Sequence, residues 1–290
     1  MHLVPDHFDI VGAKEYAKIV LEKSDLVIEE RLIGEEFTVQ AFVDGENLAF
    51  APAVQDHKRL KEGDEGPNTG GMGSYSDAKD VLPFMEESDY EDAKKIMIDT
   101  VQAIKKETGV SYKGILYGQF MATEDGISVV EFNARLGDPE SMNILPLLQN
   151  DFLEVCMDIA EGRLNPDTIR FEQKATVCKY VVPDGYPEKG RKGIHLNIGD
   201  MGRAHINYSG ACEEDGELYT TGSRALAAVG IAGTIEEAES IAEEGLFGIS
   251  GDNPGDLYVR RDIGKRELIE KRILNMNGLR KKKKKSKRAS

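Results

Sequence analysis

The sequence has no tryptophan, only three cysteines in 290 residues, and no apolar run of the roughly 18–20 residues that a membrane-spanning helix needs. Cys156, Cys178 and Cys212 are far apart, which excludes the short spacings of a zinc site and indicates free thiols in a reducing compartment. The first residues, MHLVPDHFDI, lack the basic flank and apolar stretch of a signal peptide. We therefore predict a cytoplasmic protein without a membrane partner.

Charge is abundant but unevenly distributed. Hydrophobic residues make up 40% and charged residues 31%, which is typical of a globular protein with a real core. The formal net charge is -15, and because eight basic residues lie within 280–288, the rest of the chain carries -23. This negative charge argues against a nucleic-acid partner, because neutralisation of the phosphates by basic residues supplies most of the affinity for nucleic acid. The basic end is predicted to be a solvated, disordered tail, with RNA or acidic lipid as the alternative ligand.

Hydrophobic periodicity and turn residues predict an α+β fold rather than a regularly alternating, doubly wound sheet. Helices are expected over Ser88–Glu107, over 151–160, and from Thr234, where Glu237 completes a capping box. Runs of β-branched and aromatic residues predict strands over Thr38–Val43, Ile115–Met121, Ile127–Asn133, Ala175–Val182 and Ala225–Ile231. We divide the chain into an unassigned segment (1–12), a first domain (13–163), a smaller mixed α/β domain (170–275) and a low-complexity tail (276–290).

The segment GILYGQFMATEDGISVVEFNARLGDPE, residues 114–140, is the most informative. Two strand-like runs flank a short turn that ends in Gly126, so a hairpin is expected. If the turn is centred on Asp125, Gln119 faces Glu131 and Tyr117 faces Asn133. The same count pairs Thr123 with Ile127 and Met121 with Val129, unless a bulge shifts the register by one residue.

That register places Gln119, Glu131 and Asn133 together on one sheet face. Three oxygen-bearing side chains suit a hard cation such as Mg²⁺, and the absence of imidazole and thiolate makes zinc improbable. A polar, solvated sheet face explains the same pattern. The alternative is weakened by the charged residues that follow the strand, because sites gather at strand ends.

The run VVEFNARLGDPE, residues 129–140, resembles the metal-binding strand of ATP-grasp enzymes, and in particular of the phosphoribosylamine–glycine ligase family. The resemblance implies that Glu131 and Asn133 hold the Mg²⁺ or Mn²⁺ ions that bridge the ATP phosphates, with Gln119 completing the set. It also implies that Arg135 and Asp138 line the phosphate and substrate side of the pocket, where we assign them to catalysis.

Two further segments carry the resemblance. The segment VIEERLIGEEFTVQAF, residues 27–42, is similar to the hinge strand and following strand that bind adenine in this family. An amphipathic strand, an acidic turn at Gly34 and a second strand without a ligand would explain the segment equally well. The resemblance implies ATP-binding roles for Glu29, Glu30, Arg31 and Leu32 at the base and for Glu36 at the ribose. The C-terminal segments KATVCKYVVPDGYP, LYTTGSRALAAVGIAGTIEEAESIAEEG and YVRRDIG resemble the closing domain of the same ligase, with Ser223 and Arg224 near the pocket.

Residues 52–76, PAVQDHKRLKEGDEGPNTGGMGSYS, form a glycine-rich segment suited to a mobile loop over phosphates. It is neither a P-loop nor a dinucleotide fingerprint, and a plain flexible loop remains the alternative. The string AVQDHKR…GPNTGGMG nonetheless resembles the signature of this ligase family. It implies that the residues contacting ligand or shaping the substrate site are Asp56, Lys58, Asn68, Thr69, Gly70 and Gly71.

The implied reaction joins glycine to 5-phosphoribosylamine at the expense of ATP, in purine biosynthesis, through a glycyl phosphate. Family members begin with a domain that helps to bind the ribosylamine, followed by a lid with lysines on the triphosphate. Only twelve residues precede Ala13, so we expect this ATP-grasp fold to be incomplete and little active alone. The alternatives are a non-catalytic subunit that needs a separate N-terminal half chain, and another ATP-grasp ligase or carboxylase.

Overall fold

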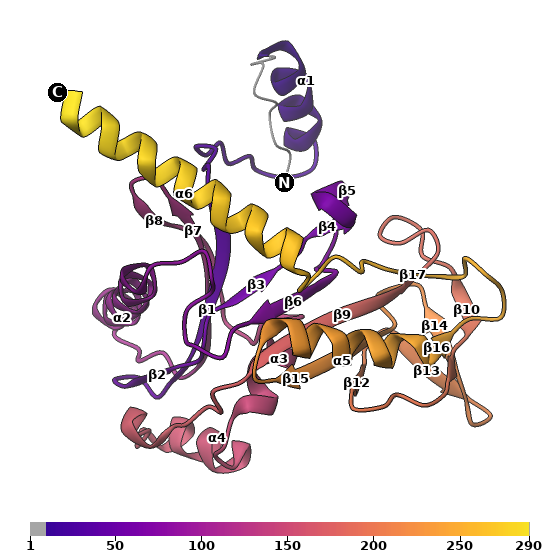
Figure 1. Cartoon of the computed structure of the whole chain (residues 1–290). Helices are drawn as coiled ribbons and strands as arrows, with labels where there is room; N and C mark the ends of the chain where they lie inside the picture. Colours follow the sequence, from indigo (N-terminus) through magenta and orange to yellow (C-terminus); the bar gives the residue numbers. More distant parts are fainter. Residues whose placement is uncertain (1–9, 290) are drawn as a thin grey trace. The chain divides into compact units, whose positions relative to one another are not determined.

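The computed structural model describes the backbone of residues 10–289, and the chain forms two units, Met1–Ile33 and Gly34–Ser290, which we describe separately (Figure 1). In the first unit, helix α1 spans Ile10–Leu21, and residues 25–33 form neither helix nor strand. Of the hinge strand and following strand expected within residues 27–42, only the second is formed, as β1 (Glu35–Val43). A strand needs a partner for its backbone N–H and C=O groups.

None of the helices that the structure describes is long and apolar enough to cross a membrane.

A ten-stranded sheet organises the second unit, with antiparallel pairing between every pair of neighbours. Its main path runs β12-β15-β9-β6-β3-β1-β7-β8, while β17 pairs with β9 and β2 with β1. The strands are β1 (Glu35–Val43), β2 (Leu48–Phe50), β3 (Val54–Asp56), β6 (Gly73–Ser76), β7 (Gly114–Thr123), β8 (Gly126–Asn133), β9 (Ala175–Pro183), β12 (His205–Tyr208), β15 (Leu226–Ala232) and β17 (Leu257–Val259).

Smaller elements surround this sheet. The short sheets are β4 (Arg59–Lys61) with β5 (Glu65–Asn68), β10 (Lys192–His195) with β14 (Glu217–Thr221) and β13 (Ala211–Glu214), and β11 (Asn197–Ile198) with β16 (Ile249–Ser250). The helices are α2 (Glu87–Thr108), α3 (Ser141–Ile144), α4 (Phe152–Glu161), α5 (Ile235–Phe247) and α6 (Arg266–Ala289), with 3-10 turns η1 (Glu62–Asp64), η2 (Leu145–Leu147) and η3 (Pro166–Thr168).

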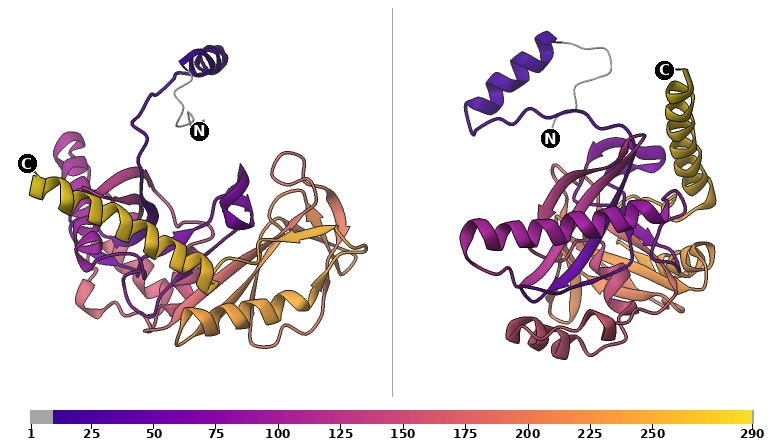
Figure 2. Two further views of the ribbon diagram at one scale, coloured as in Figure 1. Left: turned by 45° about the horizontal axis from the view of Figure 1, so that its top comes forward. Right: turned by 90° about the vertical axis from the view of Figure 1, so that its left-hand side faces the viewer.

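Alternation along β1 separates an apolar face from a polar one. Phe37 is completely buried and stacks on Phe120 of β7, with ring centroids 5.5 Å apart. Helix α2 packs on β1, β7 and β8, and its buried Ala93 and Met97 belong to the same core cluster as these rings (Figure 2). Helix α5 covers β9 and β15 in the same way. Because α2 shields the apolar face, the polar side chains of β1, β7 and β8 are left together on the other face.

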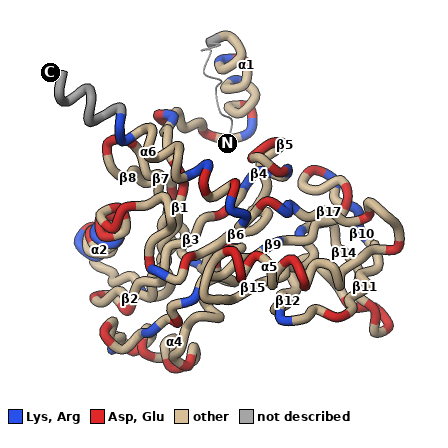
Figure 3. The backbone as a smooth tube through the Cα atoms, in the orientation of Figure 1, with Lys and Arg blue, Asp and Glu red and all other residues tan. Residues whose placement is uncertain are grey.

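The three predicted helices are confirmed, and each has the expected end signals. Gly109 closes α2 in a left-handed conformation, and Gly162 does the same for α4. Thr234 caps α5 by accepting a hydrogen bond from the backbone N–H of Glu237. Acidic residues occur along α4 and α5 (Figure 3).

In the β7–β8 hairpin, the predicted pairing is confirmed for the residues assigned to the metal site and their neighbours. Gln119 pairs with Glu131, and Tyr117 with Asn133. Near the turn the prediction is wrong by one residue, because Thr123 pairs with Gly126 and Met121 with Ser128. A two-residue turn makes the hairpin tighter than expected, and a bulge between Gln119 and Phe120 restores the register. The predicted positions of the metal-type side chains therefore hold.

The large sheet continues into the region predicted to be a separate C-terminal domain. β6 pairs with β9 from Gly73 opposite Lys179 to Ser76 opposite Thr176, so the expected boundary near residue 170 coincides with no break in the sheet. Helix α6 likewise extends through the predicted tail to Ala289. Met276 is buried in the core, and Arg280 forms an ion pair with Asp89 of α2. The helix is therefore docked at least as far as Arg280, rather than a disordered end from residue 276.

Candidate active site

A small cavity of about 70 Å³ opens beside the polar face of β7 and β8. Its walls come from the hairpin, from the segment after β3, from the loop before β6 and from the turn that follows β8. Seven of the predicted site residues line it, namely Asp56, Lys58, Gly70, Glu131, Asn133, Arg135 and Asp138. Three residues that were not predicted line it as well: Tyr117, Gly137 and Glu140.

The predicted metal-type side chains form two separate groups of hydrogen bonds. Lys58 Nζ donates to Gln119 Oε1 at 2.9 Å, and Gln119 Nε2 donates to Glu36 Oε2 at 2.8 Å. Asn133 Nδ2 donates to Glu131 Oε1 at 3.0 Å. Glu36 was assigned to the ribose, and the structure places it directly against Gln119. Two carboxylates, two amides and one ammonium group therefore meet on this sheet face.

The glycine loop is fixed to the rest of the site by Arg224, which lies two residues before β15. Arg224 donates to the carbonyl oxygens of Gly70 and Gly71 at 2.8 and 3.1 Å. Its guanidinium also pairs with Asp138 at 2.7 Å and lies 4.5 Å from the centroid of the Tyr180 ring. Tyr180 in turn donates its hydroxyl to Asp138 Oδ1 at 2.8 Å. The C-terminal part of the chain thus holds the loop closed against the turn after β8.

Two carboxyl groups near the glycine loop, those of Asp56 and Glu140, have raised pKa values. Burial and the neighbouring Glu140 carboxylate raise the pKa of Asp56 well above its usual range, although Lys58 opposes the shift. Burial also raises the pKa of Glu140, whose Oε1 accepts a hydrogen bond from the Tyr117 hydroxyl at 2.9 Å. These two carboxyl groups therefore retain a proton more readily than usual, and a nearby cation would favour their ionised form.

His57 has no role in ligand contact in this geometry. Burial, together with the cations of Arg260 and Arg272, lowers the pKa of His57 to about 3. Neither ring nitrogen has a hydrogen-bond partner among the described residues. The imidazole is consequently neutral, and its ring centroid lies 5.8 Å from that of Tyr75.

The structure does not bring every predicted residue to the cavity. Glu29, Glu30, Arg31 and Leu32 belong to the Met1–Ile33 unit, so their contact with adenine stays a prediction. Asn68 is exposed at the end of β5, and Ser223 is exposed beside Arg224 without lining the cavity. Arg135 lines the cavity and donates to the Leu136 carbonyl.

Sequence reasoning missed Tyr117, Glu140 and Tyr180 as members of the site. Tyr117 could have been found, because the same register that selected Gln119 places it opposite Asn133. Glu140 follows Asp138 within the segment already singled out. Tyr180 carries no such local signal, since only the pairing of β9 with β6 and β15 brings it near Asp138.

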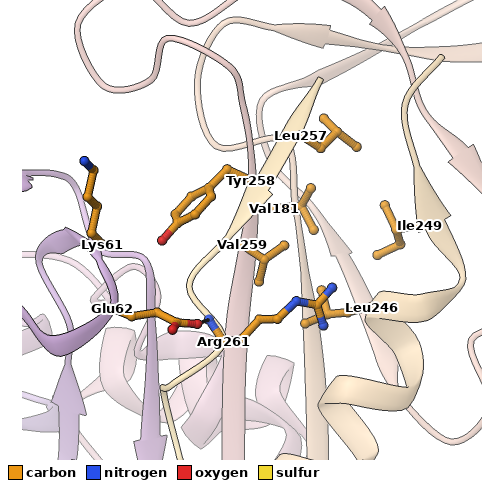
Figure 4. Close-up of a pocket in the computed structure, with 9 residues that line it drawn as sticks. All are labelled: Lys61, Glu62, Val181, Leu246, Ile249, Leu257, Tyr258, Val259 and Arg261. Carbon is orange, nitrogen blue, oxygen red and sulfur yellow. Dashed lines mark hydrogen bonds between the residues drawn. The ribbon is translucent and has the colours of Figure 1, made fainter. Parts of the chain in front are cut away.

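A larger cavity, of about 600 Å³, lies away from this chemistry (Figure 4). Its floor is apolar, with Val181, Leu246 and Leu257 among the lining residues, and Lys61, Glu62 and Arg261 stand at its edge. None of the predicted site residues lines it. We therefore place the candidate active site at the smaller cavity, where the charged and amide groups converge.

Two models of one family match this chain. The phosphoribosylglycinamide synthetase ATP-grasp (A) domain covers residues 10–141, and the C domain of the same synthetase covers residues 176–266. The chain belongs to the phosphoribosylglycinamide synthetase family. The expected α+β class and ATP-grasp assignment are thereby confirmed, and the two matched ranges lie on either side of the predicted domain boundary.

Curated proteins with similar sequences support the same family assignment. The chain is 55% identical over 272 residues to phosphoribosylamine–glycine ligase of Methanosarcina acetivorans, covering 94% of this chain and 61% of the relative. It is 52% identical over 276 residues to the enzyme of Methanocaldococcus jannaschii, covering 92% and 61%. The chain thus spans about 61% of the length of the curated relatives it matches.

Solved structures support the same synthetase fold. Phosphoribosylamine–glycine ligase from Thermotoga maritima superposes with a TM-score of 0.70 at 33% identity, over 81% of this chain and 56% of that one. The biotin carboxylase domain of Hydrogenobacter thermophilus 2-oxoglutarate carboxylase superposes with a TM-score of 0.63 at 15% identity, over 89% and 55%. The second likeness shows the shared fold alone.

Proposed function

We propose that this chain supplies the nucleotide and metal site of a phosphoribosylamine–glycine ligase. The observation that carries the proposal is the meeting of Gln119, Glu131 and Asn133 with Glu36 on one sheet face beside the glycine loop. The reaction would consume ATP, glycine and 5-phosphoribosylamine and release glycinamide ribonucleotide, ADP and phosphate. Family membership supports this reaction over others that use the same fold.

The residues fit a hard divalent cation. All candidate ligand atoms are carboxylate or amide oxygens, which Mg²⁺ and Mn²⁺ prefer. One of these oxygens already accepts a cation, since the Lys58 ammonium lies 2.9 Å from Gln119 Oε1. Among the described side chains, no three His, Cys, Asp or Glu residues form a metal-type group. Gln119, Glu131 and Asn133 would hold the ion, which would neutralise charge on the phosphates.

The proposed chemistry has two steps. A carboxylate oxygen of glycine attacks the γ-phosphorus of ATP, and the bond to ADP breaks. The ribosylamine nitrogen then attacks the carbonyl carbon of the glycyl phosphate, loses a proton and displaces phosphate. Lys58 supplies positive charge beside the metal-type residues, and the Gly70–Gly71 backbone shields the acyl phosphate from water. The raised pKa of Glu140 and of Asp56 makes either carboxyl group a candidate to exchange the amine proton.

Product analysis tests the proposal. The purified chain is incubated with ATP, Mg²⁺, glycine and 5-phosphoribosylamine, and nucleotides and products are followed by chromatography and mass spectrometry. Because the chain alone is expected to be little active, we expect slow turnover, with ADP and glycinamide ribonucleotide formed in equal amounts and each requiring all three substrates. ADP formation that instead requires bicarbonate and ignores glycine would favour an ATP-grasp carboxylase. Intact ATP binding without turnover would favour the non-catalytic subunit, and adding lysate fractions would then search for a complementing chain.

A further inference from the structure

The hairpin formed by β4 and β5 connects two parts of the candidate site. Lys58 lies immediately before β4, and Thr69 immediately after β5. The base of the hairpin is closed by two bonds to the Lys58 carbonyl oxygen, from Thr69 N at 2.7 Å and from Thr69 Oγ1 at 2.9 Å. Thr69 Oγ1 also accepts a hydrogen bond from Gly71 N at 3.0 Å. Any movement of the hairpin therefore moves both the Lys58 ammonium and the glycine loop.

The hairpin has limited apolar packing, in which Leu60 of β4 is partly buried against the main core. β4 and β5 pair only with each other, and every residue of β5 is exposed. An isolated two-stranded hairpin is at best marginally stable in water. Polar contacts must therefore add to the packing of Leu60 in holding the hairpin in one position.

The tip of the hairpin is clamped by the chain that follows β17. Gly63 N donates to Asp262 Oδ2 at 2.8 Å, and the backbone N–H of Arg261 donates to Glu62 Oε1 at 3.2 Å. Lys271 of α6 reaches the Gly63 carbonyl oxygen at 3.3 Å. Figure 4 shows Glu62 of the hairpin beside Arg261 of this second segment.

Arg260 forms the centre of this clamp and is completely buried. Its guanidinium donates to the Arg59 carbonyl oxygen at 3.1 Å, to Asp64 Oδ1 at 2.8 Å and to Asp262 Oδ1 at 2.7 Å. Arg272 of α6 donates to the other oxygen of Asp64 at 2.6 Å. A buried guanidinium is costly unless its N–H groups are satisfied, so these partners define one position for the hairpin.

Asp64 is the hairpin's own contribution to the clamp. Burial alone would raise the pKa of Asp64, but the guanidinium groups of Arg272 and Arg260 outweigh it and lower the pKa to about 2. The residue also has a positive φ of 66°. Asn tolerates this conformation as well as Asp does, so an Asp-to-Asn change removes charge without new backbone strain.

We propose that Arg260, acting through Asp64 and the Arg59 carbonyl, is a positioning residue that holds Lys58 and the Thr69–Gly71 loop at the candidate site. Its relevance to catalysis rests on the proposed function, whereas the positioning itself does not. The C-terminal segment from Arg260 to Arg272 thus belongs to the site's support, although none of its residues lines the cavity.

Hydrogen exchange by mass spectrometry tests the positioning directly on the whole chain. In Asp64→Asn we expect amide exchange in peptides covering residues 58–72 to become at least tenfold faster, while peptides from β9 and β15 stay unchanged. The control is Glu270→Gln, which breaks the exposed Arg266–Glu270 pair on α6 without touching the hairpin. Asp262→Asn is a second variant, expected to reproduce the effect because it weakens the bonds to Arg260 and Gly63.

The affinity for ATP is the second measurement. The affinity for ATP in the presence of Mg²⁺ is expected to fall about tenfold in Asp64→Asn and to stay unchanged in Glu270→Gln. Unchanged exchange over 58–72 would overturn the proposal, and so would an equal increase in all peptides, which would show general destabilisation. Faster exchange with undiminished ATP affinity would also overturn the link to the site. If the unmodified chain binds no ATP, the proposed function fails, and the exchange measurement alone decides the positioning.

Discussion

Glu131→Ala is expected to weaken metal-dependent binding of ATP about 100-fold or more, which is the order expected for losing a metal ligand or its immediate support. Glu131 contributes the carboxylate of the Gln119–Glu131–Asn133 set, and Asn133 Nδ2 is held by it at 3.0 Å. The substitution therefore removes one predicted ligand and releases another. Calorimetric titration with ATP and Mn²⁺ measures the loss.

Glu124→Ala is the matched control for that substitution. Glu124 is exposed in the turn of the same hairpin, so the change removes an equal charge far from the cavity. ATP affinity should be unchanged in the control. Equal effects of the two substitutions would mean that general charge, rather than a metal site at Glu131, governs nucleotide binding.

Gly71→Ala is expected to cost about 3 kcal/mol of stability, because strain and overpacking act together. Gly71 has φ +116°, and a Cβ atom there would lie 2.6 Å from Asp56 Oδ1 and 2.7 Å from Pro139 Cδ. The proline ring has little freedom to retreat, so the loop must shift away from Asp138 and Arg224. We also expect ligase activity to fall by a factor of about 100, since positioning errors near 1 Å have effects of that order. Urea unfolding and initial rates provide the two measurements.

The chain contains a suitable control glycine. Gly109 has φ +73°, but a Cβ atom there would meet nothing within 4 Å. Gly109→Ala should therefore show only the conformational penalty, about 1 kcal/mol, with normal activity. Similar losses in the two variants would show that the close approach of the Gly71 backbone to Asp56 and Pro139 is unimportant.

Local patterns carried the correct part of the sequence-based prediction. In the β7–β8 hairpin, alternation placed Gln119 opposite Glu131 although the turn was misjudged, because the bulge compensates for the tighter turn. Helix ends were readable for the same reason, since Gly109 and Thr234 act within one helical turn.

Contacts between distant segments could not be predicted in this way. The bond from Arg224 to Gly70 joins residues 154 positions apart, and that from Arg260 to Asp64 joins residues 196 apart. Such pairs depend on β9 lying between β6 and β15, an arrangement that no single segment encodes. The docking of α6 was missed because the lysine-rich end dominates its composition, whereas Met276 and Arg280 on the preceding turns find partners only in the folded chain.

Metal-dependent binding of ATP by the unmodified chain is the central property to measure. Calorimetric titration with ATP in the presence of Mg²⁺, repeated with the metal chelated, measures it. We predict saturable binding to one site that is lost or weakened at least tenfold without the metal. Absence of binding under both conditions would contradict the proposal, because the ATP-grasp fold would then be present without a working nucleotide site.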